Sequence, residues 1–167
     1  SRAVRTLSSP IAGSYTLEAL LSSGGLGIAW FRDRLSGMDP MDGPIEPRLN
    51  DLAADVPPGA RGVQFLPYLT SAETPYWDAD ARGAFVGFSD THGVPELYRA
   101  VLEGLALEER LTLKRVEKAT GTAVERLVVM GGGTKSALFN QILADALQRP
   151  IDVCAEPETT CLGAAIL

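Results

Sequence analysis

Three consecutive glycines, residues 131–133, separate an apolar run from an amphipathic pattern in the stretch VVMGGGTKSALFNQILADAL. The apolar run ahead of them predicts a strand, and the apolar residues behind them recur at helical spacing. Glycine loses more conformational freedom on folding than any other residue, so three in succession need a reason. This feature constrains the chain to a strand, a tight turn and a helix, the unit from which α/β proteins are built.

Local chemistry leaves two interpretations of this turn open. A strand that ends in glycines before a helix leaves free backbone N–H groups at the positive end of the helix dipole, which suits an anion or a nucleotide. The same glycines also suit a tight turn without a ligand. The stretch matches neither the GxxxxGK[ST] nor the GxGxxG pattern, since Lys135 comes two residues after the last glycine and no glycine lies five residues before it.

A second group of glycines, Gly24, Gly25 and Gly27, lies in SSGGLGIAW. Alternating apolar residues predict a strand over 14–21, and helical spacing predicts a helix over 26–35. The glycines between them read as a second turn from strand to helix. One such turn favours a purely structural role, but two in one small α/β unit favour a shared, phosphate-rich ligand.

Further strands are predicted over 62–69, 83–88, 124–130 and 149–154, because short apolar runs are bounded there by turn residues. Pro67 is expected to end the first of these strands. Strands and helices alternate, so the predicted fold class is α/β. A last helix is predicted over 158–167, with Thr159 or Thr160 as its N-cap.

The strongest helical pattern spans residues 93–121. Pro95 suits its first turn and Gly121 its C-terminal end. Gly104 within it predicts close packing of a neighbour, because glycine costs about 1 kcal/mol relative to alanine inside a helix. One face is apolar and carries Leu97, Tyr98, Val101, Leu102 and Leu105. The helix after the triple glycine has a similar face, made of Phe139, Ile142, Leu143, Ala146 and Leu147.

Residues 36–62 differ from the rest of the chain because they are rich in Pro, Gly and Asp. This composition predicts an irregular surface insertion with one short helical piece near residues 49–55.

Composition narrows the function classes. The net charge is −6 and no basic stripe is present, which argues against nucleic-acid binding. No apolar run approaches the roughly 20 residues of a membrane helix, and the N-terminal stretch lacks the apolar region of a signal peptide. Cys154 and Cys161 fit no zinc pattern and favour reduced thiols in a cytoplasmic protein. The chain starts at Ser1 and stops inside an apolar helical pattern, from which we expect a piece of a longer protein.

The other polar candidates favour structural roles. Glu73, Asp78 and Asp80 could bind a metal or act as bases, but a polar loop held by neighbouring aromatic residues is the simpler interpretation. His92 lies among residues typical of a helix start, and no Ser-His-Asp set can be built around it.

Four blocks together resemble the C-terminal domain of the FGGY family of carbohydrate kinases: GVQFLPYLTSAETPYWDADARGAFVGF, ELYRAVLEGLALEERL, VMGGGTKSALFNQILADALQRPI and ETTCLGAAIL. The resemblance extends from about residue 15 to residue 167 in the family's order. The block GAFVGFSDTHGVPELYRAVLE is similar to the family's C-terminal signature and departs from it at Phe88, where an aliphatic residue is usual. SAETP departs from the common GERTP by placing Glu73 at or near an arginine position, so one loop contact of the family is in doubt.

The resemblance implies an actin-like ATPase (ribonuclease H-like) fold with two lobes. Residues 1–167 would form the second, C-terminal lobe, which holds the nucleotide. The implied activity is ATP-dependent phosphorylation of a sugar hydroxyl, with ATP and Mg²⁺ as cofactors and a xylulose-like ketose as the favoured acceptor. The implied partners are ATP or ADP and, through the other lobe, a small sugar; a homodimer would fit the family.

The resemblance also assigns nucleotide contacts. Gly131 and Gly132 match glycines that lie against the adenosine part of ATP. Ser136 matches a position that contacts adenine in relatives, and Gly25 matches a glycine near the phosphates. Ala29 matches a polar nucleotide contact of some relatives, so that contact is expected to be absent.

No catalytic residue and no metal ligand is assigned to this chain, because the family's general base, its magnesium-binding aspartates and most of its sugar contacts belong to the first lobe. We therefore expect the isolated chain to be inactive. Two alternatives are kept: a non-catalytic module of the same fold that binds nucleotide or another protein, and a structural role exerted through residues 36–62.

Overall fold

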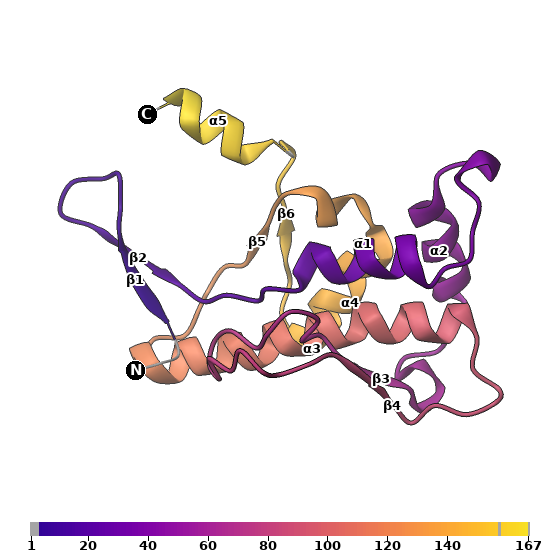
Figure 1. Ribbon diagram of the computed structural model, residues 1–167. Coiled ribbons are helices and arrows are strands. Elements are labelled where there is room, and N and C mark those ends of the chain that lie inside the picture. The colour runs from indigo at the N-terminus through magenta and orange to yellow at the C-terminus, as the bar shows by residue number, and fades with distance from the viewer. Residues whose placement is uncertain (1–3, 157, 167) are drawn as a thin grey trace.

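The computed structural model describes residues 4–156 and 158–166. Helices and short strands alternate along the described chain, as the α/β prediction requires (Figure 1). The helices are α1 (Gly24–Arg34), α2 (Ile45–Ala54), α3 (Val94–Thr120), α4 (Ala137–Leu147) and α5 (Thr159–Ile166). The strands are β1 (Arg5–Ser8), β2 (Tyr15–Glu18), β3 (Gln64–Leu66), β4 (Ala84–Val86), β5 (Val128–Val129) and β6 (Asp152–Val153). Short 3₁₀ turns are η1 (Pro40–Asp42), η2 (Ala60–Gly62) and η3 (Gly132–Lys135).

The long helix α3 organises the core. It contacts α1, α2, α4 and β3, so elements from both halves of the chain meet on it (Figure 1). Its predicted apolar face is confirmed, since Tyr98, Val101, Leu102 and Leu105 are buried. The buried cluster consists of Phe31, Leu49, Ala53, Ala60, Val63, Phe65, Tyr98, Ala100, Val101, Leu102, Leu105, Ala106, Ile142 and Leu143.

Strands β3 and β4 form an antiparallel pair against α3, with Phe65 opposite Phe85. Their rings lie 4.8 Å apart, and Phe65 is buried between the sheet and the helix. β3 ends immediately before Pro67, as predicted. The close approach predicted at Gly104 is also confirmed, because a Cβ there would collide with the carbonyl oxygen of Phe65.

Strands β5 and β6 are parallel and joined through the glycine turn and α4. The amide of Asp152 donates to the carbonyl of Leu127 at 2.8 Å, and that of Cys154 to the carbonyl of Val129 at 2.9 Å. Both predicted strands exist but are shorter than expected.

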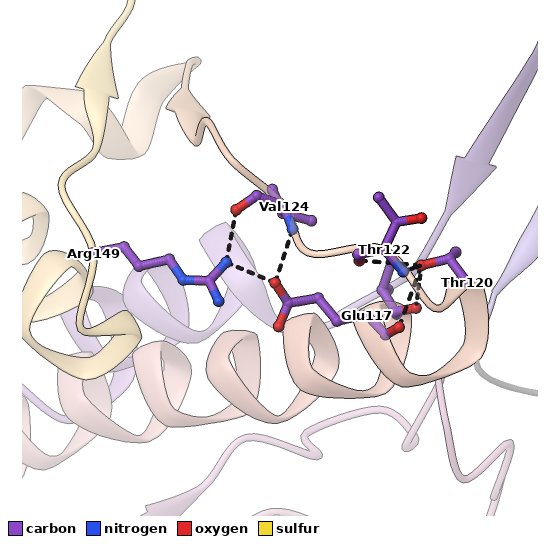
Figure 2. A network of polar contacts seen from close by, with 6 residues as sticks. Glu117, Thr120, Thr122, Val124 and Arg149 are labelled. Carbon is purple, nitrogen blue, oxygen red and sulfur yellow. Dashed lines mark hydrogen bonds and ion pairs between the residues drawn. The ribbon is translucent and has the colours of Figure 1, made fainter.

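A polar network fixes β5 to the end of α3 (Figure 2). One carboxylate oxygen of Glu117 accepts from the guanidinium of Arg149 at 2.7 Å and from the amide of Val124 at 2.9 Å. Arg149 also donates to the carbonyl of Val124 at 2.7 Å. Gly121 ends α3 in the left-handed conformation, as predicted. The segment that leads into β5 is therefore held at both its N–H and its C=O groups.

The hairpin of β1 and β2 lies to one side of the helical core (Figure 1). The sequence predicted β2 but not β1, whose four residues are all exposed and lack the apolar alternation of a half-buried strand. Arg5 and Glu18 pair across the hairpin at 2.5 Å.

Three predictions need correction. Gly24, Gly25 and Gly27 do not form a turn but belong to the first turns of α1. The short helical piece predicted near residues 49–55 exists as the longer α2, which buries Leu49 and Ala53 completely, so residues 36–62 are not wholly an irregular surface insertion.

The third correction concerns the last helix. Thr159 is its first helical residue and not its cap, because the carbonyl of Glu158 already accepts from the amide of Leu162. Among the described residues, no helix is long and apolar enough to cross a bilayer.

Candidate functional site

A cavity of about 550 Å³ lies between α1, α2, the glycine turn η3 and the start of α4. Three of the four predicted site residues, Gly25, Gly132 and Ser136, line it together. Gly25 is more than 100 positions from Gly132 and Ser136 along the chain, so the fold has brought distant elements together. The fourth, Gly131, is adjacent to the cavity in sequence but does not line it.

Gly25 lies in the first turn of α1, where backbone amides have no partner within the helix. The residue before the helix, Ser23, makes no capping hydrogen bond with its side chain. Its hydroxyl accepts instead from the amide of Leu69 at 3.2 Å. The N-terminus of α1 therefore presents uncapped N–H groups, and the partial positive charge of the helix dipole, at one end of the cavity.

The cavity extends along one face of α1. Gly25, Ala29 and Arg32 line it at helical spacing, which corresponds to about 10 Å of helix from the first to the last. Ala29, in the middle of this face, carries no polar group. A Cβ at Gly25 would meet no atom within 4 Å, so nothing in the fold itself requires glycine at this position.

The glycine turn is held by its own hydrogen bonds. Gly131 has a φ of 86°, a conformation that favours glycine. Its carbonyl accepts from the amide of Thr134 at 3.2 Å and from the Thr134 hydroxyl at 2.7 Å. The side-chain amide of Asn140 donates to the carbonyl of Thr134 at 2.9 Å. Gly131 thus shapes the turn through its positive φ, and a Cβ at either Gly131 or Gly132 would meet no atom within 4 Å.

Ser136 connects the turn to α4 and to α2. Its hydroxyl oxygen caps α4 by accepting from the amide of Phe139 at 3.1 Å, and its proton is donated to Oδ1 of Asn50 at 3.0 Å. Sequence reasoning missed Asn50, because it lies in the segment read as a surface insertion. The apolar pair Leu49 and Ala53, four residues apart, was the available signal that α2 packs against the core.

The far end of the cavity is polar. Arg32 donates to Glu46 at 2.7 Å and to Asp33 at 2.6 Å, and the bonded guanidinium lowers the pKa of Asp33. Tyr98 lies on the cavity wall with only 1% of its surface exposed. Burial raises its pKa to about 12, helped by the nearby charge of Glu46.

The other sequence candidates have structural roles in the described chain. Asp78 accepts from the amides of Asp80 and Ala81, which closes a polar loop. The ring of His92 accepts from the amide of Ser89 at 2.9 Å. Within the part of the chain that the structure describes, no three His, Cys, Asp or Glu side chains are grouped so as to hold a metal.

A second cavity, of about 490 Å³, lies between α3, β5 and α4. Its lining is mainly apolar, and none of the four predicted site residues contributes to it. The first cavity is therefore the candidate functional site.

Comparison with known proteins gives the context of this cavity. The model of the FGGY family of carbohydrate kinases, C-terminal domain, matches residues 2–167. Glycerol kinase 2 of Saccharolobus solfataricus is 37% identical over 154 residues, which is 92% of this chain and 30% of that protein. The chain thus spans about 30% of the length of the curated relatives that it matches.

Solved structures are similar as well. Xylulose kinase from Rhodospirillum rubrum superposes with a TM-score of 0.78 and 31% identity, covering 94% of this chain and 31% of that one. Plasmodium falciparum glycerol kinase with ADP has a TM-score of 0.76 and 27% identity, covering 91% of this chain and 29% of that one. These similarities confirm the predicted fold class: the chain is α/β and has the architecture of the C-terminal lobe of an actin-like ATPase.

Proposed function

This chain belongs to the FGGY family of carbohydrate kinases as a C-terminal domain, and from that premise we propose that it is the nucleotide-binding lobe of an ATP-dependent kinase that phosphorylates a hydroxyl group of a sugar or sugar derivative. One observation carries the proposal. Gly25, Gly132 and Ser136, assigned to the nucleotide from the sequence alone, line one cavity.

The shape and polarity of this cavity suit a nucleoside phosphate. The uncapped amides around Gly25 suit the phosphates, because a helix N-terminus attracts anions. The bare backbone at Gly132 suits the sugar and base, which can approach it closely. Ser136, Asn50 and Tyr98, which line the same cavity, then provide polar groups for the base.

Mg²⁺ enters the proposal with the phosphates. This cation is commonly bound through one or two carboxylates together with substrate phosphates. Glu46, the carboxylate on the cavity wall, is already paired with Arg32. We assign the carboxylates for Mg²⁺ and the general base for the acceptor hydroxyl to the other lobe.

For the acceptor we propose a xylulose-like ketose. The likeness to a xylulose kinase structure supports this choice, whereas the likeness to glycerol kinases favours a polyol as the second candidate. A coupled assay of ADP release by the full-length kinase, run over ketoses, polyols and sugar acids, decides between them. The 167-residue chain alone is expected to bind ADP but to release none from ATP in the presence of any of these acceptors.

Gly25→Ala tests the nucleotide site, because it is expected to weaken ADP binding without lowering the melting temperature. The new methyl group meets nothing in the protein and improves helix propensity, by up to about 1 kcal/mol, so the melting temperature should not fall. The same methyl group lies in the cavity, so ADP affinity measured by calorimetry should fall about tenfold, which corresponds to 1.4 kcal/mol.

Gly24→Ala is the matched control. Gly24 lies in the same helical turn, has equally open space and does not line the cavity. It should keep wild-type ADP affinity. Unchanged ADP affinity in Gly25→Ala, or no ADP binding by the wild-type chain, would contradict the proposed function.

A further inference from the structure

The hydroxyl of Ser136 has a fixed hydrogen-bonding polarity. A hydroxyl group has one proton and two acceptor lone pairs. The amide of Phe139 can only donate, so it occupies one lone pair, and the proton is committed to Oδ1 of Asn50. One lone pair remains. Toward a ligand in the cavity, Ser136 is therefore an acceptor only.

Asn50 is held firmly enough to impose this polarity. Its neighbours on α2, Leu49 and Ala53, have no exposed surface and anchor the helix in the core. One turn earlier, Glu46 is bonded to Arg32 of α1 at 2.7 Å. Asn50 and Ser136 are both half-buried and both line the cavity, so a ligand meets the pair with limited access of water.

We propose that Asn50 is a positioning residue that sets the base preference of the nucleotide site in favour of a 6-aminopurine over a 6-oxopurine. The inference rests on the proposed function. Adenine presents an N–H donor at its exocyclic position, where guanine presents an oxygen acceptor. The remaining lone pair of Ser136 accepts from the amine, whereas a 6-oxo group would face it with a second lone pair. Asn50 acts by holding the Ser136 proton away from the base.

The test compares ADP with inosine diphosphate, which differs at the 6-position and the adjacent ring nitrogen. Binding of each to the 167-residue chain is measured by calorimetry. The wild type should bind ADP at least about tenfold more tightly, because a buried mismatch of two acceptors costs on the order of 1–3 kcal/mol. In Asn50→Ala the Ser136 hydroxyl is free to rotate and donate to the 6-oxo group, so the ratio should fall to about threefold or less.

Conservative and double variants separate this role from a structural one. Asn50→Asp keeps an oxygen that accepts the Ser136 proton and should retain most of the preference. Ser136→Ala removes the group through which Asn50 acts, so adding Asn50→Ala to it should not change the ratio further. Asp51→Ala, an exposed neighbour on α2, is the control and should leave both affinities unchanged.

The outcomes distinguish the inference from its premise. Failure of the wild-type chain to bind ADP overturns the proposed function and this inference with it. ADP binding by the wild type together with an unchanged ratio in Asn50→Ala, or an equal loss of both nucleotides, overturns the inference alone. If Asn50→Ala does not fold, Asn50→Leu, which is closer in volume and likewise offers no acceptor, takes its place.

Discussion

At the scale of single residues, Gly104 shows how one missing side chain brings a strand and a helix together. A methyl group at this position would collide with the carbonyl of Phe65 on β3. Gly104→Ala is therefore expected to destabilise the chain by about 1–3 kcal/mol through overpacking, despite the better helix propensity of alanine. At 150–250 residues this lowers the melting temperature by about 2–4 °C per kcal/mol.

Thermal denaturation of Gly104→Ala should be compared with that of Gly163→Ala. Gly163 lies in α5, where a Cβ would meet no atom within 4 Å. The control should match or exceed the wild type, since only the helix-propensity gain applies. Equal melting temperatures for the two variants would show that β3 can shift away from residue 104 with no loss of stability, which would contradict the prediction.

Glu108 is a buried carboxyl group, and its ionisation is expected to lower the stability of the folded chain. It is 8% exposed, and its Oε2 accepts from the Tyr68 hydroxyl at 3.1 Å. Burial raises its pKa, while the bond from Tyr68 lowers it by a smaller amount. Because the folded pKa lies above the unfolded one, the folded state binds more protons, and stability falls as pH rises from about 4.5 through the folded pKa.

Glu108→Gln should remove this cost and keep an oxygen that accepts from Tyr68. Melting temperatures of variant and wild type should coincide well below pH 4.5, because Glu108 is then protonated in both the folded and the unfolded chain. The variant should become the more stable of the two as pH rises to 8. A variant less stable than the wild type at pH 8 would mean that the ionised carboxylate is stabilising.

Residues differ in how far the sequence predicts them. Gly25, Gly132 and Ser136 could be proposed as site residues because they match family motifs, and the structure places all three along one cavity. Asn50 and Tyr98 could not, because their roles depend on α2 and α3 being brought against the glycine turn. A helical pattern predicts that Tyr98 is buried but does not predict that it lines a cavity together with α2 and the glycine turn.

At the scale of elements, α1 shows why local propensity was misleading. Glycine is a poor helix former, so SSGGLGIAW predicted a turn before the helix. The structure continues the helix through these residues, and Gly27 faces α3, where a Cβ would lie 3.7 Å from the methyl carbons of Leu105. Tertiary packing thus outweighs propensity here, and the same applies to α2, whose buried residues were hidden by the Pro- and Gly-rich composition around it.

The bond between Arg149 and Glu117 is expected to govern the stability of the β5–β6 pair (Figure 2). Arg149→Met removes the donor to Glu117 and to the carbonyl of Val124, so the melting temperature should fall and amide exchange near Val128 should accelerate. Arg126→Met is the control. Its partner Asp152 is largely exposed, as is Arg126 itself, and exposed ion pairs contribute little.

The effect should depend on pH with a defined sign. The hydrogen bond from Arg149, followed by that from the Val124 amide, lowers the pKa of Glu117 in the folded state. The stabilisation is therefore present above the unfolded pKa of about 4.5 and is lost as pH falls through the folded value. The melting temperatures of the wild type and Arg149→Met should differ most at neutral pH and converge in acid. A difference that does not change with pH would show that the effect comes from packing and not from the ion pair.

At the scale of the whole molecule, the described strands form three separate two-stranded sheets, and the helices carry most of the core. The α/β class and the order of the elements after β1 could be predicted, because strands and helices differ in the spacing of their apolar residues. The pairing of strands could not, since β1, β5 and β6 are short and carry little apolar alternation. The hairpin of β1 and β2 is largely exposed, whereas one face of α3 is buried in the core (Figure 1).

This contrast predicts unequal local stability. A two-stranded hairpin alone is at best marginally stable in water, and every residue of β1 is exposed. The hairpin is tied to the rest of the chain by Thr74, whose hydroxyl bonds both the amide and the carbonyl of Leu20. Amides of residues 5–8 and 15–18 should exchange with deuterium far faster than those in the middle of α3, where opening requires loss of the core.

Addition of ADP separates the site from the hairpin in the same experiment. If the cavity binds the nucleotide, exchange should slow in peptides covering residues 24–29 and 131–136, because their amides become covered by the ligand. The hairpin lies outside this cavity and should keep its fast exchange. Protection of residues 5–18 by ADP, with the glycine turn unaffected, would place the nucleotide elsewhere on the molecule and contradict the assignment of the cavity.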